Sequence, residues 1–279
     1  MAKGLSVLRR RITSIKATKK VTKAMQMIAT TKLKTWKQSM LESRLYAEKL
    51  VEIVQTNLHH ESLKGSVFFK LDTTLPKLYV VITSNLGLCG PYNYNILNEL
   101  TKHVKSKDRI IAIGEKSIRF LKNTKLMYSA DFVNAGSLSD ATLSPLIQEI
   151  LNEYQQRKFG KVIILYTKFI NSLLFQPSEL QLLPLSLETF KGKLNLQPPL
   201  IEPDPLSVFE KLVPFYLKNS TYATLIESQV SEQSSRRNAM EKASDNADEL
   251  VDQLQLDFNK QRQANITQEI AEIIGGASS

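Results

Sequence analysis

The chain has 279 residues, of which 42% are hydrophobic and 23% are charged, with one cysteine and a net charge of +10. This length suits one large domain or two modest ones, and the composition is that of an ordinary globular protein. The single cysteine excludes an internal disulfide, and no apolar run approaches the roughly 20 residues of a transmembrane helix. Any membrane role must therefore be peripheral.

The positive charge is concentrated at the N-terminus. Eleven of the 37 Lys and Arg residues lie in residues 1–41, which hold no acidic residue, so the remaining 26 are balanced by the 27 acidic residues. Three interpretations are open: a mitochondrial transit peptide, a nucleic-acid-binding arm, and a helix that faces an acidic protein partner. The segment is far longer than a transit peptide, and Trp36 is its only aromatic residue, which disfavours the first two.

Two long runs, residues 5–64 and 215–274, contain neither Gly nor Pro. Because these residues are the main helix breakers, each run is predicted to be one long helix. Sixty residues at about 1.5 Å each reach about 90 Å, which is longer than a domain of this size is wide. Helices of that length need a partner, and the simplest arrangement pairs the two runs as a coiled coil.

The apolar spacing supports this pairing in part. Steps of three and four residues occur in three sets: Leu5, Leu8, Ile12 and Ile15; Ala17, Val21, Ala24 and Ile28; and Ala247, Val251, Leu254 and Phe258, after which Gln261 breaks the pattern. These sets predict seam-like stretches with phase shifts rather than a sustained heptad. The alternative is two broken helix bundles, but residues 228–249 are too polar to be buried on more than a thin stripe.

The region between the runs alternates strand and helix patterns. β-Branched apolar runs predict buried strands at 77–85, 108–114 and 161–169, with a further edge strand in 177–185, and helices are predicted at 94–105, 115–123 and 144–158. Pro145 suits the first turn of the last of these helices, and residues 197–205 form a Pro-rich connector. The alternation predicts an α/β domain with a largely parallel sheet. The chain thus divides into residues 1–64, 65–213 and 214–279.

One glycine loop, "TSNLGLCGPYNYN" at 83–95, follows a strand and precedes a helix. A phosphate cradle and a thiolate nucleophile at Cys89 are conceivable there. The loop fits neither known phosphate-binding motif, and the chain's histidines, His59, His60 and His103, offer no obvious base. A tight turn with a packed thiol is the favoured interpretation. We expect no catalytic residue, metal or cofactor in this chain, which points to a structural or coupling role.

Sequence blocks in the same order along the chain resemble the gamma subunit of F-type ATP synthases of the bacterial type. They are "ATKKVTKAMQMIA" (17–29), "GLCGPYN" (87–93), the lesser blocks at 166–173, 181–185 and 202–205, "RRNAMEKASDNA" (236–247) and "NKQRQANITQEIAEIIGGA" (259–277). The resemblance implies a central rotor stalk: an antiparallel coiled coil of the terminal helices plus a Rossmann-like α/β domain at its foot. It implies coupling of ion translocation through a membrane ring to ATP synthesis or hydrolysis elsewhere in the complex.

The resemblance also implies partners and site residues. The partners are the alpha and beta subunits of the catalytic ring, the epsilon subunit and the membrane ring of c subunits, with no nucleic acid. The residues implied to contact the ring are Met25, Arg236, Arg262, Gln263, Thr267 and Glu269, and Glu202 is implied to lie at the foot near the c ring. The resemblance places the protein at the cytoplasmic side of a bacterial plasma membrane, as a peripheral component. The match to the family from the first helix onward argues against a transit peptide.

Two departures from the family pattern stand out. Asn85 and Leu86 replace an Asp and a basic residue before the glycine loop, where a surface ion pair or a foot contact is then missing. The closing "GGASS" (275–279) is more polar than the usual end, which leaves the contact at the tip in question. The alternatives are a specialised relative in which the same shaft serves another machine and, remotely, an α/β enzyme that uses the 83–95 loop.

Overall fold

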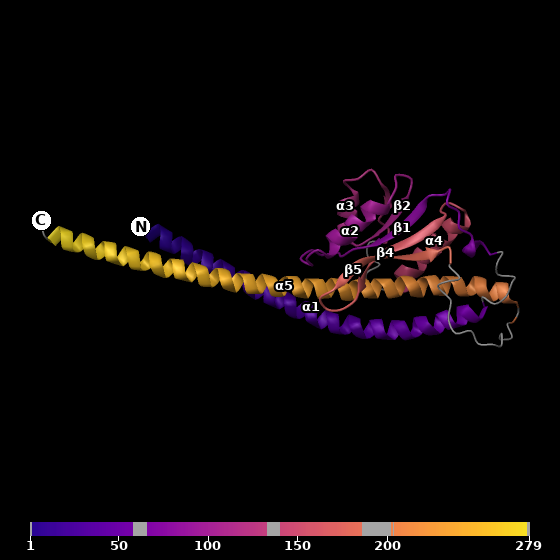
Figure 1. Cartoon of the computed structure of the whole chain (residues 1–279), viewed down its shortest axis with the longest axis horizontal. Helices are drawn as coiled ribbons and strands as arrows, with labels where there is room; N and C mark the ends of the chain where they lie inside the picture. The colour runs from indigo at the N-terminus through magenta and orange to yellow at the C-terminus, as the bar shows by residue number, and fades with distance from the viewer. Residues whose placement is uncertain (1, 58–65, 133–139, 186–201, 203, 278–279) are drawn as a thin grey trace. The chain divides into compact units, whose positions relative to one another are not determined.

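The structure is a computed structural model that describes residues 2–57, 66–132, 140–185, 202 and 204–277 (Figure 1). In chain order its elements are α1 (Ala2–Asn57), η2 (Val67–Phe69), β1 (Lys77–Ile82), α2 (Tyr92–His103), β2 (Arg109–Ile113), α3 (Glu115–Leu121), β3 (Met127–Ser129), α4 (Asp140–Gln155), β4 (Lys161–Phe169), β5 (Phe175–Leu183) and α5 (Pro205–Ala277). They form two compact units. The paired-helix unit comprises Met1–Thr30 and Arg236–Ser279, and the sheet unit comprises Thr31–Ser235.

The sheet unit is built on a five-stranded sheet in the order β3-β2-β1-β4-β5. The first four strands are parallel, and β5 is antiparallel to β4 at the edge. Parallel neighbours need crossover connections, and α2, α3 and α4 supply them. The predicted α/β layer with an edge strand in 177–185 is therefore confirmed, and the antiparallel direction of that strand is added by the structure.

Both faces of the sheet are covered, which explains why its strands read as continuous apolar runs. Leu78, Val80 and Ile82 of β1 pack into a core with residues of α4 and α5, whereas Tyr79 and Val81 point to the other face. The second core is completed by buried residues of α2 and α3. In Figure 1, α5 passes along the sheet on the side opposite α2 and α3.

The structure corrects the predicted helix starts. α5 begins at Pro205, ahead of the predicted start at 215, and Pro214 lies inside it. Pro145 likewise lies in the second turn of α4 rather than its first. A proline inside a helix removes one backbone hydrogen bond. In each helix a buried apolar neighbour of the proline holds this turn in place: Val213 beside Pro214 in α5, and Leu146 beside Pro145 in α4.

Two short elements, η2 and β3, were not predicted, because three residues give too little periodicity to detect. The predicted connector 197–205 and the border at residues 64 and 65 lie largely or wholly outside the described residues. The division into 1–64, 65–213 and 214–279 stays a prediction.

Along α1 the less exposed positions follow one sustained heptad, so the predicted phase shift is wrong. The heptad positions are 5, 8, 12, 15, 19, 22, 26, 29, 33, 36, 40, 43, 47 and 50, and positions 4, 25, 37, 39 and 51 beside them are also less exposed. The second predicted stripe is exposed instead: Val21 is 58% exposed and Ile28 is 57% exposed. The heptad passes through Lys19, Thr22 and Gln26, which are polar, so a search for apolar spacing alone missed it.

The polar stretch of α5 is also more buried than predicted. Ser231, Glu232, Gln233, Ser234 and Ser235 are all buried within the sheet unit, so the helix is covered on every side there. Buried polar groups are tolerated when they are hydrogen-bonded. The hydroxyls of Ser231 and Ser235 meet this requirement by donating to backbone carbonyls of the sheet unit.

Candidate coupling surface on the paired terminal helices

The two helices of the paired-helix unit run antiparallel. Thr22 Oγ1 lies 2.7 Å from Ser244 Oγ, and Lys19 forms an ion pair with Asp248 one turn further along. Closer to the start of α1, Ile12 is buried against Val251 and Leu254, with Leu8, Ile15 and Phe258 around them. Gly4 lies against Gln261. As the residue number rises along α1, the partner's number falls along α5, so the predicted antiparallel pairing is confirmed.

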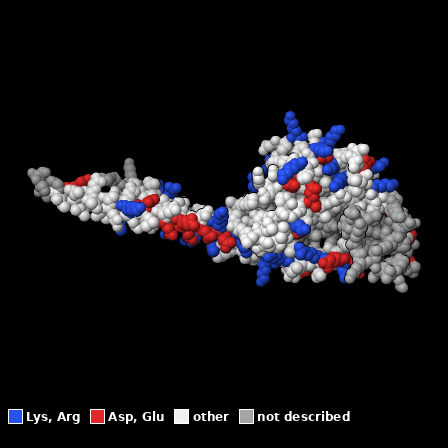
Figure 2. Space-filling model, viewed as in Figure 1, with Lys and Arg blue, Asp and Glu red and all other residues white. Residues whose placement is uncertain are grey.

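The positive charge at the N-terminus is partly matched within the chain itself. Asp245, Asp248, Glu249 and Asp252 are exposed on α5, and Figure 2 shows acidic side chains gathered on the paired helices. Of this group, Asp248 forms the ion pair with Lys19. Among the described residues, Asp248 is therefore an acidic partner for part of the N-terminal excess.

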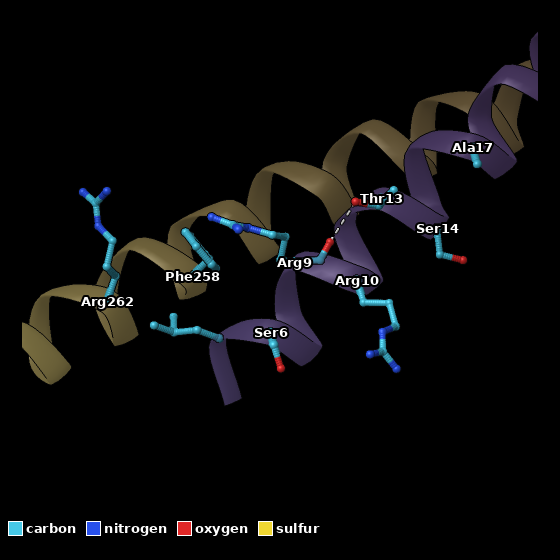
Figure 3. A pocket seen from close by; sticks show the side chains of 9 residues that line it. Ser6, Arg9, Arg10, Thr13, Ser14, Ala17, Phe258 and Arg262 are labelled. Atoms are coloured by element: carbon cyan, nitrogen blue, oxygen red, sulfur yellow. Dashed lines mark hydrogen bonds between the residues drawn. The ribbon is translucent and has the colours of Figure 1, made fainter. Parts of the chain in front are cut away.

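A groove of about 780 Å³ lies where the start of α1 meets α5. Its lining residues are Leu5, Ser6, Arg9, Arg10, Thr13, Ser14, Ala17, Phe258 and Arg262. Figure 3 shows the six labelled side chains of α1 on one side and Phe258 and Arg262 on the other. The Arg9 guanidinium lies 5.7 Å from the centre of the Phe258 ring, a cation–π contact.

Three arginines surround this groove without a carboxylate. Among the residues that the structure describes, Arg9, Arg10 and Arg262 form no ion pair, and all three are exposed. Guanidinium groups bind carboxylates through paired hydrogen bonds, and the apolar walls supplied by Leu5 and Phe258 lower the local dielectric. The groove is therefore suited to an acidic segment.

α5 extends beyond the N-terminal end of α1 (Figure 1). Beyond Gln261 its described side chains are exposed apart from the half-buried Asn265, and Figure 1 shows the C-terminal end of the helix lying beyond the N-terminus of α1. Ile266, Ile270, Ile273 and Ile274 share one face of this overhang, and Ile273 is 71% exposed. The overhang therefore presents an amide-rich section followed by an apolar one.

The implied ring-contact residues fall into two groups that the structure does not bring together. Met25 and Arg236 are half-buried at one end of the paired-helix unit, whereas Arg262, Gln263, Thr267 and Glu269 are exposed at the other. At about 1.5 Å per residue, the groups lie about 30 Å or more apart along the helices. Glu202 is exposed in a bend of the sheet unit.

The glycine loop between β1 and α2 is a tight turn with a packed thiol, as predicted. Leu88 and Gly90 have φ angles of 60° and 55°, in the left-handed region. Cys89 is buried, and its Sγ accepts a hydrogen bond of 3.1 Å from Asn93 Nδ2. Asn93 Oδ1 in turn accepts from the Ser84 backbone N–H at 3.0 Å. These bonds fix the turn against the start of α2.

Asn85 and Leu86, the predicted departures from the family pattern, have identifiable surroundings. Asn85 Oδ1 accepts a hydrogen bond of 3.1 Å from the backbone N–H of Glu115, the first residue of α3. Helix N-termini have unpaired N–H groups, so Asn85 stabilises this end. Leu86 is 71% exposed. Asn85 is thus a helix cap, and Leu86 is an apolar surface residue.

Comparison with known proteins decides the family. A family model described as ATP synthase matches residues 4–279. The ATP synthase gamma chain of Mycoplasma mobile is 36% identical, covering 99% of this chain and 98% of its own length. The chain belongs to the ATP synthase gamma-chain family. The gamma chain of Heliobacterium modesticaldum is 34% identical, with 99% coverage of both chains.

Solved structures agree with this assignment. A chain in the structure of the central stalk and c ring of the Tetrahymena thermophila mitochondrial ATP synthase matches 80% of this chain and 99% of its own, with 27% identity and a TM-score of 0.57. A chain of the Euglena gracilis mitochondrial ATP synthase shares the fold, with a TM-score of 0.69 and 20% identity, covering 100% of this chain and 95% of that one. The function implied by the resemblance, that of the gamma subunit in the central stalk, is confirmed.

The structure adds groove residues that the sequence did not single out for this gamma chain. Residues 9–11 are three consecutive arginines, which is visible in the sequence. Only the antiparallel pairing shows that Arg9 and Arg10 share a groove with Arg262. Among the described helices, none has an apolar stretch long enough to cross a membrane.

Proposed function

We propose that this gamma chain turns as a rigid shaft and carries rotation between an ion-translocating membrane ring and a catalytic ring of alpha and beta subunits. ATP is made or hydrolysed by the catalytic ring, and this chain contributes no catalytic group. Its other partners are the epsilon subunit and the ring of c subunits, which meet the sheet unit. The complex holds it at the cytoplasmic side of a bacterial plasma membrane, as a peripheral component.

One observation carries the proposal: the far end of α5 leaves its partner helix and presents a graded surface. Arg262, Gln263, Thr267 and Glu269 offer charges and hydrogen-bonding groups, and the isoleucines at 266, 270, 273 and 274 follow as an apolar face. A monomeric protein rarely leaves such a face open unless a partner covers it. A surrounding ring of subunits would cover every side of the overhang.

The groove gives the ring contact its chemistry. In the described part of the chain no carboxylate pairs with Arg9, Arg10 or Arg262. The carboxylates of an acidic loop of a beta subunit would form ion pairs with these arginines. Charge-assisted hydrogen bonds of this kind contribute about 1.5–3 kcal/mol each. Arg262 and Gln263 then bind and release successive subunits as the shaft turns. Met25 and Arg236 act at a second level, at the other end of the paired-helix unit.

Co-purification tests the proposal directly. The full chain, tagged and expressed in its host, should bring down a catalytic alpha/beta ring whose ATP hydrolysis drives ion movement. A chain recovered without such a ring would overturn the rotor proposal. The alternative, an α/β enzyme using the 83–95 loop, predicts tight binding of ATP by the chain alone, which equilibrium dialysis measures.

A further inference from the structure

One face of α5 is hydrogen-bonded to the backbone of the sheet unit through side chains. β1 pairs with β4 as far as Val81 with Leu165, whereas β4 continues to Phe169. On its other side β4 stays paired with β5 as far as Phe169 with Phe175. The last residues of β4 therefore have one edge that β1 does not reach, and backbone groups on such an edge need other partners.

Side chains of α5 supply those partners. Ser228 Oγ accepts from the Thr167 N–H at 3.3 Å, and Ser231 Oγ donates to the Thr167 carbonyl at 3.0 Å. Glu227 Oε1 accepts from the Phe169 N–H at 3.2 Å. Alternate residues of a strand direct their backbone groups to the same edge, so these three bonds occupy one continuous edge.

A fourth bond joins the same helix face to the glycine loop. Ser235 Oγ donates to the Cys89 carbonyl at 2.6 Å. Residues 228, 231 and 235 are spaced by three and four, so they share one face of α5, with Glu227 beside them. None of the residues Ser228, Ser231 and Ser235 is more than 2% exposed. The bonds are therefore shielded from water, which strengthens them.

Polar bonds hold a helix differently from apolar packing. Further toward its N-terminus, α5 contacts the sheet through Phe209, Val213 and Leu217, whose burial has no preferred direction. Hydrogen bonds weaken steeply when their angle changes, so four of them on one face oppose both sliding of α5 and its rotation about its own axis. α5 then continues without a break as far as Ala277.

We propose that Glu227, Ser228, Ser231 and Ser235 form a torque joint, which locks α5 to the backbone of β4 and the glycine loop so that rotation of the sheet unit turns the helix. This role rests on the proposed rotor function. The four side chains are positioning residues, because they act through the helix and touch no nucleotide. Weakening the joint lets the sheet unit and α5 slip, so that ATP hydrolysis is separated from ion movement.

The test compares two double variants in the assembled, membrane-reconstituted complex. Ser231→Ala with Ser235→Ala removes two bonds of the joint. Ser43→Ala with Ser234→Ala removes two buried hydroxyls of the sheet unit that have no hydrogen-bond partner among the described residues. The readout is the number of ions moved per ATP hydrolysed. The first variant should keep hydrolysing ATP and move fewer ions per ATP, and the control should match the parent chain.

A joint variant that assembles and moves as many ions per ATP as the parent would overturn the torque joint while leaving the rotor function intact. Failure of the parent chain to recruit a catalytic ring would instead count against the rotor function itself. A variant with Ser231→Ala and Ser235→Thr, which keeps the second hydroxyl, should recover part of the ratio lost in the double alanine variant.

Hydrogen exchange keeps the proposal testable if the double variant does not assemble. In the isolated full chain, the Thr167 and Phe169 amides should exchange about fivefold faster when Ser231 and Ser235 are alanine, because the one lost bond at this edge, from Ser231 to the Thr167 carbonyl, contributes about 1 kcal/mol. The Ser43 and Ser234 control should leave these two amides unchanged. Equal exchange in the joint variant, the control and the parent would overturn the proposal.

Discussion

Ile12→Ala and Ile28→Ala make the same chemical change at two positions of α1 with opposite burial. Ile12 is 8% exposed and packs against Val251 and Leu254, whereas Ile28 is 57% exposed. Loss of three carbon groups at about 0.8 kcal/mol each gives about 2 kcal/mol at Ile12, since the site is nearly covered. At Ile28 less than half of that surface is buried, and the loss should stay below about 1 kcal/mol. The gain in helix propensity is equal at the two positions and cancels.

Amide hydrogen exchange in the full chain measures the difference turn by turn, which suits a protein whose two units need not unfold together. The amides around residue 12 should exchange about 30-fold faster in Ile12→Ala, the factor that corresponds to about 2 kcal/mol. Those around residue 28 should change by about fivefold or less in Ile28→Ala. If the second variant is perturbed as strongly as the first, the heptad through Lys19, Thr22 and Gln26 is wrong and the apolar stripe predicted from the sequence is right.

Four further outcomes are expected. Gly114→Ala should destabilise the sheet unit by more than about 3 kcal/mol, because Gly114 has a φ of 94° and a Cβ there would lie 2.2 Å from the Thr83 carbonyl oxygen; a urea midpoint equal to the parent's contradicts this. Burial raises the pKa of Glu227 above its ordinary 4.5. The unfolded chain therefore releases this proton at a lower pH than the folded chain does, and the free energy of unfolding falls as pH rises from 4.5 through the raised pKa. Glu227→Gln should gain stability relative to the parent between roughly pH 4 and pH 7, and a stability difference between the two that does not change with pH refutes this. Gln263→Leu should remove hydrogen bonds between α5 and the catalytic ring, of about 1 kcal/mol each, and so change the rate of rotation or ATP hydrolysis. An unchanged rate would show that Gln263 does not contact the ring. Met25→Lys should lower ions moved per ATP more than it lowers assembly, and a proportional fall in hydrolysis and pumping speaks against it.

Sequence reasoning located the strands of the sheet well because each is a β-branched apolar run between polar or glycine signals. β4 was predicted at residues 161–169 and has those bounds, and β2 was predicted within one residue at each end. The edge strand was also found, although its antiparallel direction was not predicted. Such runs can be recognised without knowledge of distant residues, since a strand buried on both faces is apolar along nearly its whole length.

What the sequence could not show were polar residues whose partners are distant along the chain. Nothing near Ser231 indicates that the Thr167 carbonyl, 64 residues away, will accept its hydroxyl proton. The stretch was therefore predicted to be mostly exposed. The same reason hid Lys19 and Thr22 in the seam of α1, because a polar residue reads as a surface residue until its partner is known.

The groove was missed for a related reason. Arg9 and Arg10 belong to a run that is plainly basic in the sequence, but the groove that they form with Arg262 depends on how α1 and α5 pair. The family resemblance supplied Arg262 and Gln263 as ring contacts without locating their neighbours on the other helix. These residue roles remain predictions until the variants are measured.

The polar pairs of the seam explain how the site at the end of α5 is placed. An exposed ion pair such as Lys19 with Asp248 adds little to stability, yet a shift of α5 by one turn would separate it and the Thr22–Ser244 bond together. Apolar contacts such as those around Ile12 tolerate such a shift better, because burial has no direction. Polar residues at seam positions are known to fix register in this way. Since register sets how far α5 extends beyond Gly4, these pairs determine which residues stand free of α1 at the tip.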